Sequence, residues 1–164
     1  MSTRQLERLV ERAERLKVQG KRIAERREEP VSNTDLSWLQ GFRRTAYTMA
    51  DVLYDIIKEP SWFWFLNDIG FVAHRLYYIA REGKGTKRKD LQLDEISKTY
   101  MKYIDEYYKE ATGKERCTWL LDVQEPYTYS AIIDDLMACF NRGIEKLEEE
   151  SKGWVFKGKS MWKI

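Results

Sequence analysis

Apolar residues recur along most of the chain at steps of three and four positions, the spacing that places side chains on one face of an α-helix. Over residues 3–28 they form a seam like that of a short coiled coil. The seam residues are Leu6, Leu9, Ala13, Leu16, Gly20 and Ile23. Almost all other positions here are Arg, Lys or Glu, so this helix needs a partner surface in its own chain or in another.

A second helix is expected after a break at residues 29–33, with Asn33 or Thr34 as its cap and Lys58 near its end. One face of this segment is apolar in helical projection. The residues on that face are Trp38, Leu39, Phe42, Ala46, Met49, Ala50, Leu53, Ile56 and Ile57. This face predicts a helix that packs on the core along its whole length.

A third helix is expected to start at Pro60 and to stop at Gly83. One side of this helix is wholly apolar and is expected to be buried. Its residues are Phe65, Leu66, Ile69, Val72, Ala73, Leu76 and Ile79. The segment also contains Asp68 and Arg75, and such residues each cost about 2.5–3.5 kcal/mol at the centre of a membrane-spanning helix. The pattern therefore predicts a buried helix and no membrane contact.

A fourth helix is expected from about Leu91 to Ala111, with Gly113 just beyond it. Its predicted buried residues are Leu93, Ile96, Tyr100, Tyr103, Ile104, Tyr107 and Ala111. A fifth helix is expected after Pro126 and ends near Glu150. Its predicted buried residues are Tyr129, Ile132, Ile133, Leu136, Phe140, Ile144 and Leu147. Residues 117–123 fit a short helix or a strand.

These segments predict one all-α domain over residues 1–164, a bundle or array of about five helices. Residues 1–29 are expected as a charged N-terminal helix, residues 30–150 as the helical core, and residues 151–164 as a basic aromatic tail. The tail is expected either as a small β-hairpin or as an extended segment. A chain of 164 residues with only three prolines suits this architecture.

Charge is segregated along the chain although the net charge is only +2. Residues 1–90 carry 18 Lys and Arg against 13 Asp and Glu, whereas residues 91–150 carry 7 against 14. Residues 151–164 carry 4 lysines and no acid. Such asymmetry bears on the choice of partner.

The residues needed for most catalytic chemistry are scarce. There is one histidine and there are two cysteines, with no metal-ligand spacing and no phosphate-binding or dinucleotide motif. No metal, cofactor or catalytic residue is therefore predicted, and the protein is not expected to be an enzyme. A magnesium-dependent nucleotide hydrolase stays a less favoured alternative. It would use carboxylates from the pairs Asp51 with Asp55, Asp105 with Glu106, and Asp134 with Asp135.

An aromatic ridge is predicted on the third helix, on the side away from its apolar residues. Trp64, Phe71 and Tyr78 recur every seven positions, with His74 and Arg75 on the two edges of the row. Rings with a charged rim are typical of protein interfaces, so these five residues are the predicted partner-binding residues. The alternative is that another helix of the same chain covers the ridge, as is common for aromatic side chains.

Two basic segments are the predicted nucleic-acid-binding candidates, because lysines can contact phosphates while rings stack on bases. The first comprises Lys84, Lys87, Arg88 and Lys89, and the second comprises Lys152, Trp154, Lys157, Lys159, Trp162 and Lys163. Both segments are equally compatible with an ordinary solvated surface.

The sequence favours a non-enzymatic interaction protein, an accessory subunit or inhibitor that docks on a protein or nucleoprotein assembly. Direct nucleic-acid binding is the alternative, and a homodimer through the N-terminal seam is a further one. The charged N-terminus and the two cysteines predict a cytoplasmic protein.

Overall fold

The computed structural model describes residues 3–25, 32–81, 102–115 and 129–163. Within these ranges the chain forms five helices and no strand, which confirms the all-α fold. The helices are α1 (Thr3–Glu25), α2 (Asn33–Ile57), α3 (Pro60–Arg81), α5 (Lys102–Thr112) and α7 (Tyr129–Lys163).

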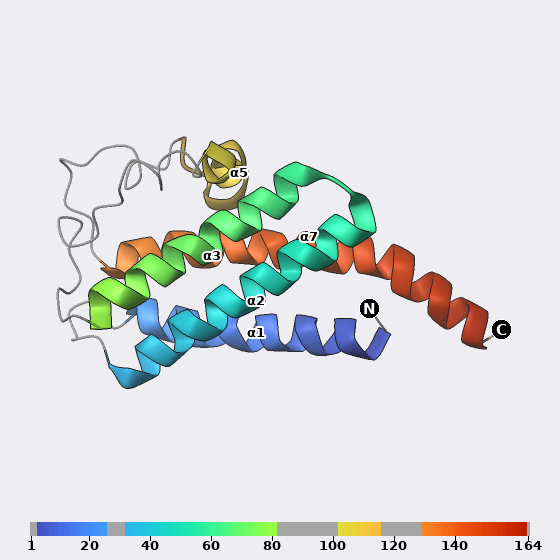
Figure 1. Ribbon diagram of the computed structural model, residues 1–164, viewed down its shortest axis with the longest axis horizontal. Coiled ribbons are helices and arrows are strands. Elements are labelled where there is room, and N and C mark those ends of the chain that lie inside the picture. Colours follow the sequence, from blue (N-terminus) through green and yellow to red (C-terminus); the bar gives the residue numbers. More distant parts are fainter. Residues whose placement is uncertain (1–2, 26–31, 82–101, 116–128, 164) are drawn as a thin grey trace.

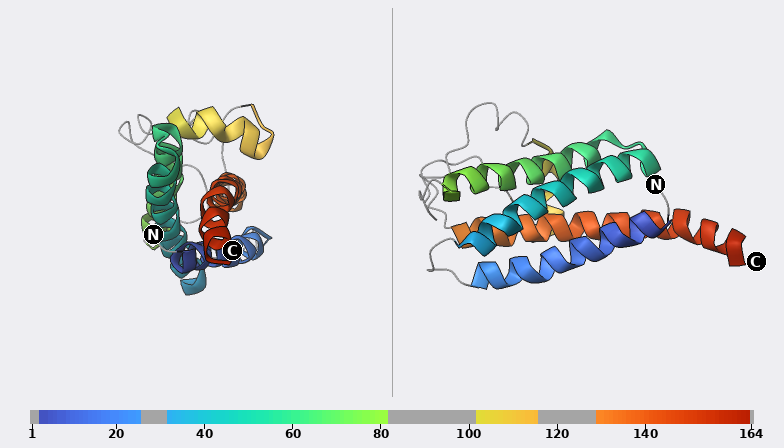
Figure 2. Two further views of the ribbon diagram at one scale, coloured as in Figure 1. Left: turned by 90° about the vertical axis from the view of Figure 1, so that its right-hand side faces the viewer. Right: turned by 60° about the horizontal axis from the view of Figure 1, so that its bottom comes forward.

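Four long helices run side by side, and α5 lies across them (Figures 1 and 2). α2 and α3 are antiparallel and share the most extensive contact, while α1 packs chiefly on α7 and also on α2. α5 contacts both α7 and α3. The described part of the chain is therefore a bundle with one crossing helix.

The two ends of α2 have well-defined caps. Ser32 is the N-cap: its hydroxyl accepts from the Asp35 N–H at 3.2 Å, and Asp35 accepts from the Ser32 N–H at 3.0 Å. The prediction of Asn33 or Thr34 was wrong by one or two positions, because only Ser32 has an acidic residue three positions later to complete a capping box. At the other end, Lys58 adopts a left-handed conformation with φ 57° and donates its N–H to the Tyr54 carbonyl.

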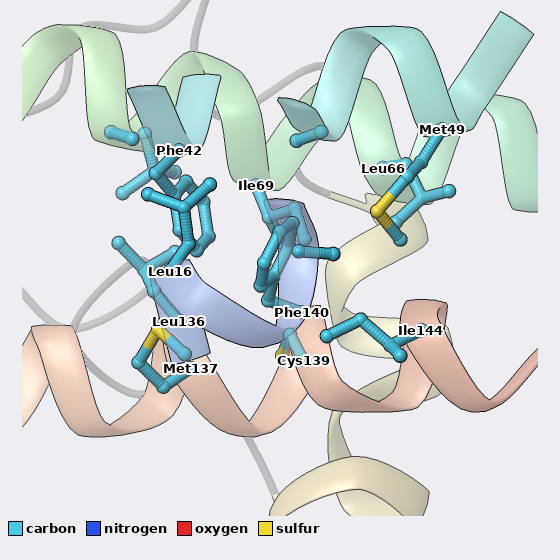
Figure 3. Packing of buried hydrophobic residues seen from close by; sticks show 14 of the residues in the cluster. Leu16, Phe42, Met49, Leu66, Ile69, Leu136, Met137, Cys139, Phe140 and Ile144 are labelled. Carbon is cyan, nitrogen blue, oxygen red and sulfur yellow. The ribbon is translucent and has the colours of Figure 1, made fainter. Parts of the chain in front are cut away.

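The core lies between α7, α1 and the α2–α3 pair (Figure 3). Phe140 of α7 packs on Phe42 of α2 with ring centroids 4.5 Å apart, and Phe42 packs on Trp38 at 5.1 Å. The predicted seam of α1, from Leu6 to Ile23, is buried in this core. Its own chain therefore supplies a partner surface for this seam.

A side chain of α2 packs directly against α1 at Gly20. Trp38 donates its ring N–H to the Leu16 carbonyl at 2.8 Å. A Cβ at Gly20 would lie 2.6 Å from Trp38 Cζ2 and 2.5 Å from Met137 Sδ. The absence of a side chain at Gly20 is therefore what lets the Trp38 ring reach the α1 backbone.

Residues 151–163 continue α7, so the expected hairpin or extended tail was wrong. This segment contains no proline, and extending an existing helix adds one hydrogen bond for each residue fixed. Its glycines cost only about 1 kcal/mol each relative to alanine. At 35 residues α7 exceeds the 23 of α1, and its last turns run past the other helices (Figures 1 and 2).

α5 ends at Thr112, and Gly113 directly after it has φ 77°, as expected of a helix-terminating glycine. The predicted first half of this helix, residues 91–101, lies outside the described residues, as do residues 117–123. Tyr108 is fully buried although the predicted stripe omitted it, and Tyr107 is half-buried. The helix is thus rotated so that Tyr108 faces α7.

Tyr108 meets a buried carboxylate of α7. Its hydroxyl donates to Asp135 Oδ2 at 2.5 Å, and Lys114 Nζ lies 2.8 Å from Asp135 Oδ1. Asp135 is not among the predicted buried residues of its helix, yet it is only 4 % exposed. A buried carboxylate needs such donors, and periodicity alone cannot show that another helix supplies them.

No helix within the described ranges is long and apolar enough to cross a membrane. This finding includes α3, whose Asp68 and Arg75 interrupt its apolar residues.

We predict opposite effects of alanine at Gly20 and at Gly41. Gly20→Ala gains about 1 kcal/mol of helix propensity but overpacks against a rigid ring, at a cost of about 1–3 kcal/mol. The free energy of unfolding is therefore expected to fall by about 1 kcal/mol. At Gly41 the nearest atom to a Cβ is Leu16 Cδ2, 3.3 Å away, and this methyl group can shift. Gly41→Ala is expected to stabilise the protein by up to about 1 kcal/mol.

Urea denaturation of the two variants beside the original chain measures both changes. Equal midpoints for Gly20→Ala and Gly41→Ala would contradict the close approach of Trp38 to α1.

Candidate partner-binding surface

Exposed aromatic side chains concentrate on α2 and α3. Among the residues whose burial is described, the exposed large apolar and aromatic ones are Tyr54 at 42 %, Trp64 at 38 %, Tyr78 at 38 % and Val18 at 53 %. All except Val18 belong to the α2–α3 pair. The pair presents these rings in two groups.

The first group, the turn cluster, lies where α2 is joined to α3. The Tyr54 and Phe63 rings meet edge to face at 5.7 Å, and Phe63 meets Trp64 in the same manner at 5.3 Å. Lys58 Nζ lies 5.6 Å from the centre of the Tyr54 ring. These contacts hold three rings and one cation in a fixed arrangement at this end of the pair.

The second group, the His74 cluster, lies near the other end of the pair. Arg43 Nη1 of α2 is 2.5 Å from His74 Nδ1 of α3. The His74 ring meets Tyr78 edge to face at 4.8 Å, and the Arg81 guanidinium lies 5.0 Å from the Tyr78 ring and 5.7 Å from that of Tyr77. The cluster therefore combines two guanidinium groups with a partly exposed ring.

The contact with Arg43 fixes the state of His74. A guanidinium is always protonated and can only donate, so His74 Nδ1 must accept with its lone pair and the proton must sit on Nε2. Burial lowers the pKa of His74 below its usual 6.5, and the charges of Arg43 and Arg75 lower it further. His74 is therefore a neutral ring that positions Arg43 and Tyr78.

Tyr47 packs between the two clusters. A Cβ at Gly70 would lie 2.7 Å from Tyr47 Cε1, so the ring lies directly on the α3 backbone. Burial raises the pKa of Tyr47, with the charge of Asp68 adding to the effect and Arg43 opposing it. Phe63, Asn67, Gly70 and His74 follow one another at steps of three or four residues along one stripe of α3. This spacing places both clusters on the same surface. We call it the α2–α3 surface: Arg43, Tyr47, Tyr54, Lys58, Phe63, Trp64, Asn67, His74, Tyr77, Tyr78 and Arg81.

The predicted aromatic ridge is present only in part. Trp64 and Tyr78 are exposed, but Phe71 between them is half-buried and packs against the core. His74 contacts Tyr78 directly, whereas Trp64 belongs to the turn cluster. Arg75 is half-buried and acts on His74 through its charge.

Sequence reasoning missed the contribution of α2 to this surface. Arg43, Tyr47 and Tyr54 are spaced by four and seven positions, which places them on one side of a helix. That spacing was a usable signal for a second stripe on α2. Nothing in it, however, indicates that the stripe lies beside His74 and Phe63.

The predicted nucleic-acid-binding residues are placed only in part. Lys84, Lys87, Arg88 and Lys89 lie outside the described residues. Positions 152, 154, 157, 159, 162 and 163 belong to α7, whose backbone is helical there.

The predicted carboxylate pairs do not form a cluster within the described residues. Asp51 and Asp55 are exposed on α2, Asp134 is exposed on α7, and Asp135 is buried against Tyr108 and Lys114. Glu106 is exposed on α5. In the described ranges no group of three His, Cys, Asp or Glu is placed to hold a metal ion.

A cavity of about 800 Å³ opens between the end of α1 and the start of α2. The apolar residues that line it are Leu16, Ile23 and Trp38. The polar residues that line it are Gln19, Arg22, Asn33, Thr34 and Ser37. Arg22 is the only charged residue among them, so the lining offers hydrogen bonds rather than acid–base chemistry. The cavity depends on how far α1 and α2 diverge, which the sequence does not reveal.

No protein-family model, curated protein or solved structure matches this chain.

We predict that His74 titrates below pH 6.5. It is the only histidine, so its imidazole proton signal in an NMR titration is unambiguous. Replacing Arg43 with glutamine removes a neighbouring positive charge, and the midpoint of the His74 titration is expected to rise in Arg43→Gln.

Because the unfolded chain binds the His74 proton more tightly than the folded chain does, the contribution of His74 to stability is present above pH 6.5. It is lost as the pH falls through the pKa of His74 in the folded protein.

A midpoint at or above 6.5 in the original chain would contradict the burial of His74 beside Arg43. Arg44→Gln is a suitable control, because Arg44 is exposed on the same helix and is not among the groups that shift His74.

Proposed function

We propose that this protein is a non-enzymatic interaction protein, an accessory subunit or inhibitor that docks on a protein partner through the α2–α3 surface. The observation that carries the proposal is the gathering of Tyr54, Trp64 and Tyr78 on one helical pair, together with Arg43 and Arg81. Trp, Tyr and Arg are the residue types that contribute most to binding free energy in protein interfaces.

The rings of this surface are held in place before any partner binds. Tyr78 lies between His74 and Arg81, and Trp64 rests against Phe63. Side chains that are already ordered lose less conformational entropy on association than free ones do. Such preorganisation supports a role of these rings as anchors in a complex.

Charge on the same side of α2 supports a protein partner over a nucleic-acid backbone. Asp51 lies one turn from Tyr47, Asp55 follows Tyr54, and both carboxylates are exposed. They would repel phosphate groups, whereas a protein surface can match mixed charges. The free, buried thiol of Cys139 supports the further proposal that the protein acts in the cytoplasm.

The test is affinity capture from the native host with tagged protein, in which quantitative mass spectrometry compares the original chain with a Trp64→Ser, Tyr78→Ser double variant. Truncation of an interface anchor typically costs 2 kcal/mol or more, so partner recovery is expected to fall about tenfold or more. The matched control is Val18→Ser, which removes an exposed apolar side chain from α1 and is expected to leave recovery unchanged.

Equal recovery of the same proteins by the double variant and the control would refute the role of this surface. A captured complex whose affinity falls steeply with salt, and that disappears on nuclease treatment, would instead favour direct nucleic-acid binding.

A further inference from the structure

The last part of α7 is not explained by the α2–α3 surface. Figures 1 and 2 show its final turns extending beyond the ends of α1, α2 and α3. Residues 151–163 add about 20 Å of helix at about 1.5 Å per residue. We call this part the α7 extension.

Helical continuity determines which positions of the extension share a face. At about 100° per residue, positions 154, 158 and 161 fall in line with position 147, where Leu147 is fully buried in the core. Positions 155 and 162 fall at the edge of the same arc, which spans about 120°. The residues at these positions are Trp154, Val155, Gly158, Met161 and Trp162. The apolar face of α7 thus continues in register past the bundle.

The remaining arc of the extension is basic. Residues 151–163 contain four lysines and no Asp or Glu. Positions 152, 157, 159 and 163 all fall outside the apolar arc. Two positions break the separation: Ser151 falls within the apolar arc, and Phe156 falls within the basic one. A hairpin or an extended tail would not separate apolar and basic residues in this way.

We propose that the α7 extension is an interfacial helix that binds the surface of an anionic membrane. A helix with a narrow Trp-containing apolar face and a lysine-rich polar face suits the boundary between lipid headgroups and acyl chains. The lysines match the negative potential of anionic lipids. The earlier expectation of no membrane contact rested on the lack of a spanning helix, and a helix that lies on the surface needs no spanning length.

Other occupants fit the extension less well. Single-stranded nucleic acid favours rings and lysines that lie together along one groove, whereas here both tryptophan positions fall in the arc that contains no lysine. A second copy would bring two sets of lysines together with no acid in either extension to offset them. The membrane proposal does not depend on the α2–α3 surface, so each stands or fails on its own test.

Vesicle co-sedimentation of the full chain tests the proposal. Vesicles of phosphatidylcholine alone are compared with vesicles of phosphatidylcholine and phosphatidylglycerol in equal parts. We expect at least about tenfold tighter binding to the anionic vesicles. We expect the double variant Trp154→Ser, Trp162→Ser to weaken this binding about tenfold or more. A second variant with glutamine at all four lysines is expected to weaken it by a similar factor.

The matched control replaces four exposed arginines of α1 with glutamine, and so removes the same charge from another helix. These arginines are Arg4, Arg8, Arg12 and Arg15. This control is expected to change vesicle binding less than about threefold. Circular dichroism of each variant checks that the bundle remains folded.

Three outcomes would overturn the proposal. The original chain does not bind anionic vesicles, the control loses as much binding as the lysine variant, or the serine variant binds as tightly as the original. Binding of a single-stranded oligonucleotide that requires the four lysines, without any binding to vesicles, would assign the extension to nucleic acid instead.

Discussion

The packing of α2 on α3 is the contact that the proposed binding surface depends on. It is close because Gly70 has no side chain, which leaves the Tyr47 ring directly against the α3 backbone. At this separation Arg43 reaches His74 across the pair, and Tyr54 reaches Phe63. A wider spacing would break both contacts, and the rings would lose the neighbours that fix their orientation. The surface is therefore a property of the helical pair and not of either helix alone.

Buried polar groups hold the rest of the bundle in register with this pair. The Trp38 N–H is satisfied by the Leu16 carbonyl, which links α2 to α1. α5 is held across the bundle by the buried carboxylate of Asp135, which accepts from the Tyr108 hydroxyl. Contact of the Tyr107 and Trp62 rings at 4.7 Å adds to this. Each buried polar group costs free energy if its partner is displaced, so these contacts favour one arrangement of helices over alternatives.

Much of the fold follows from apolar periodicity. The predicted faces of α2, α3 and α7 contain Phe42, Phe65 and Phe140, and all three are fully buried. The errors arose where a residue's role is set by a partner far away in sequence. Asp135 is indistinguishable from a solvated carboxylate until α5 supplies Tyr108 and Lys114, and the continuation of α7 past Glu150 depends on helix propagation rather than on a local signal.

The candidate site was less predictable than the fold for the same reason. Seven-residue spacing identified Trp64 and Tyr78, which are exposed, but it placed Phe71 with them although the core half-buries that ring. The α2 half of the surface requires knowledge of which helices are neighbours. Amphipathic patterns give the direction of a face within one helix but not the identity of the opposing helix.

The short link between α2 and α3 has a consequence for the order in which the chain assembles. Only Lys58 and Glu59 separate the two helices, so their contact closes a very small loop and loses little chain entropy. The contact of α1 with α7 joins segments separated by more than half of the chain and requires a far larger loop to close. We expect α2 and α3 to associate early in folding, before the contact of α1 with α7 forms.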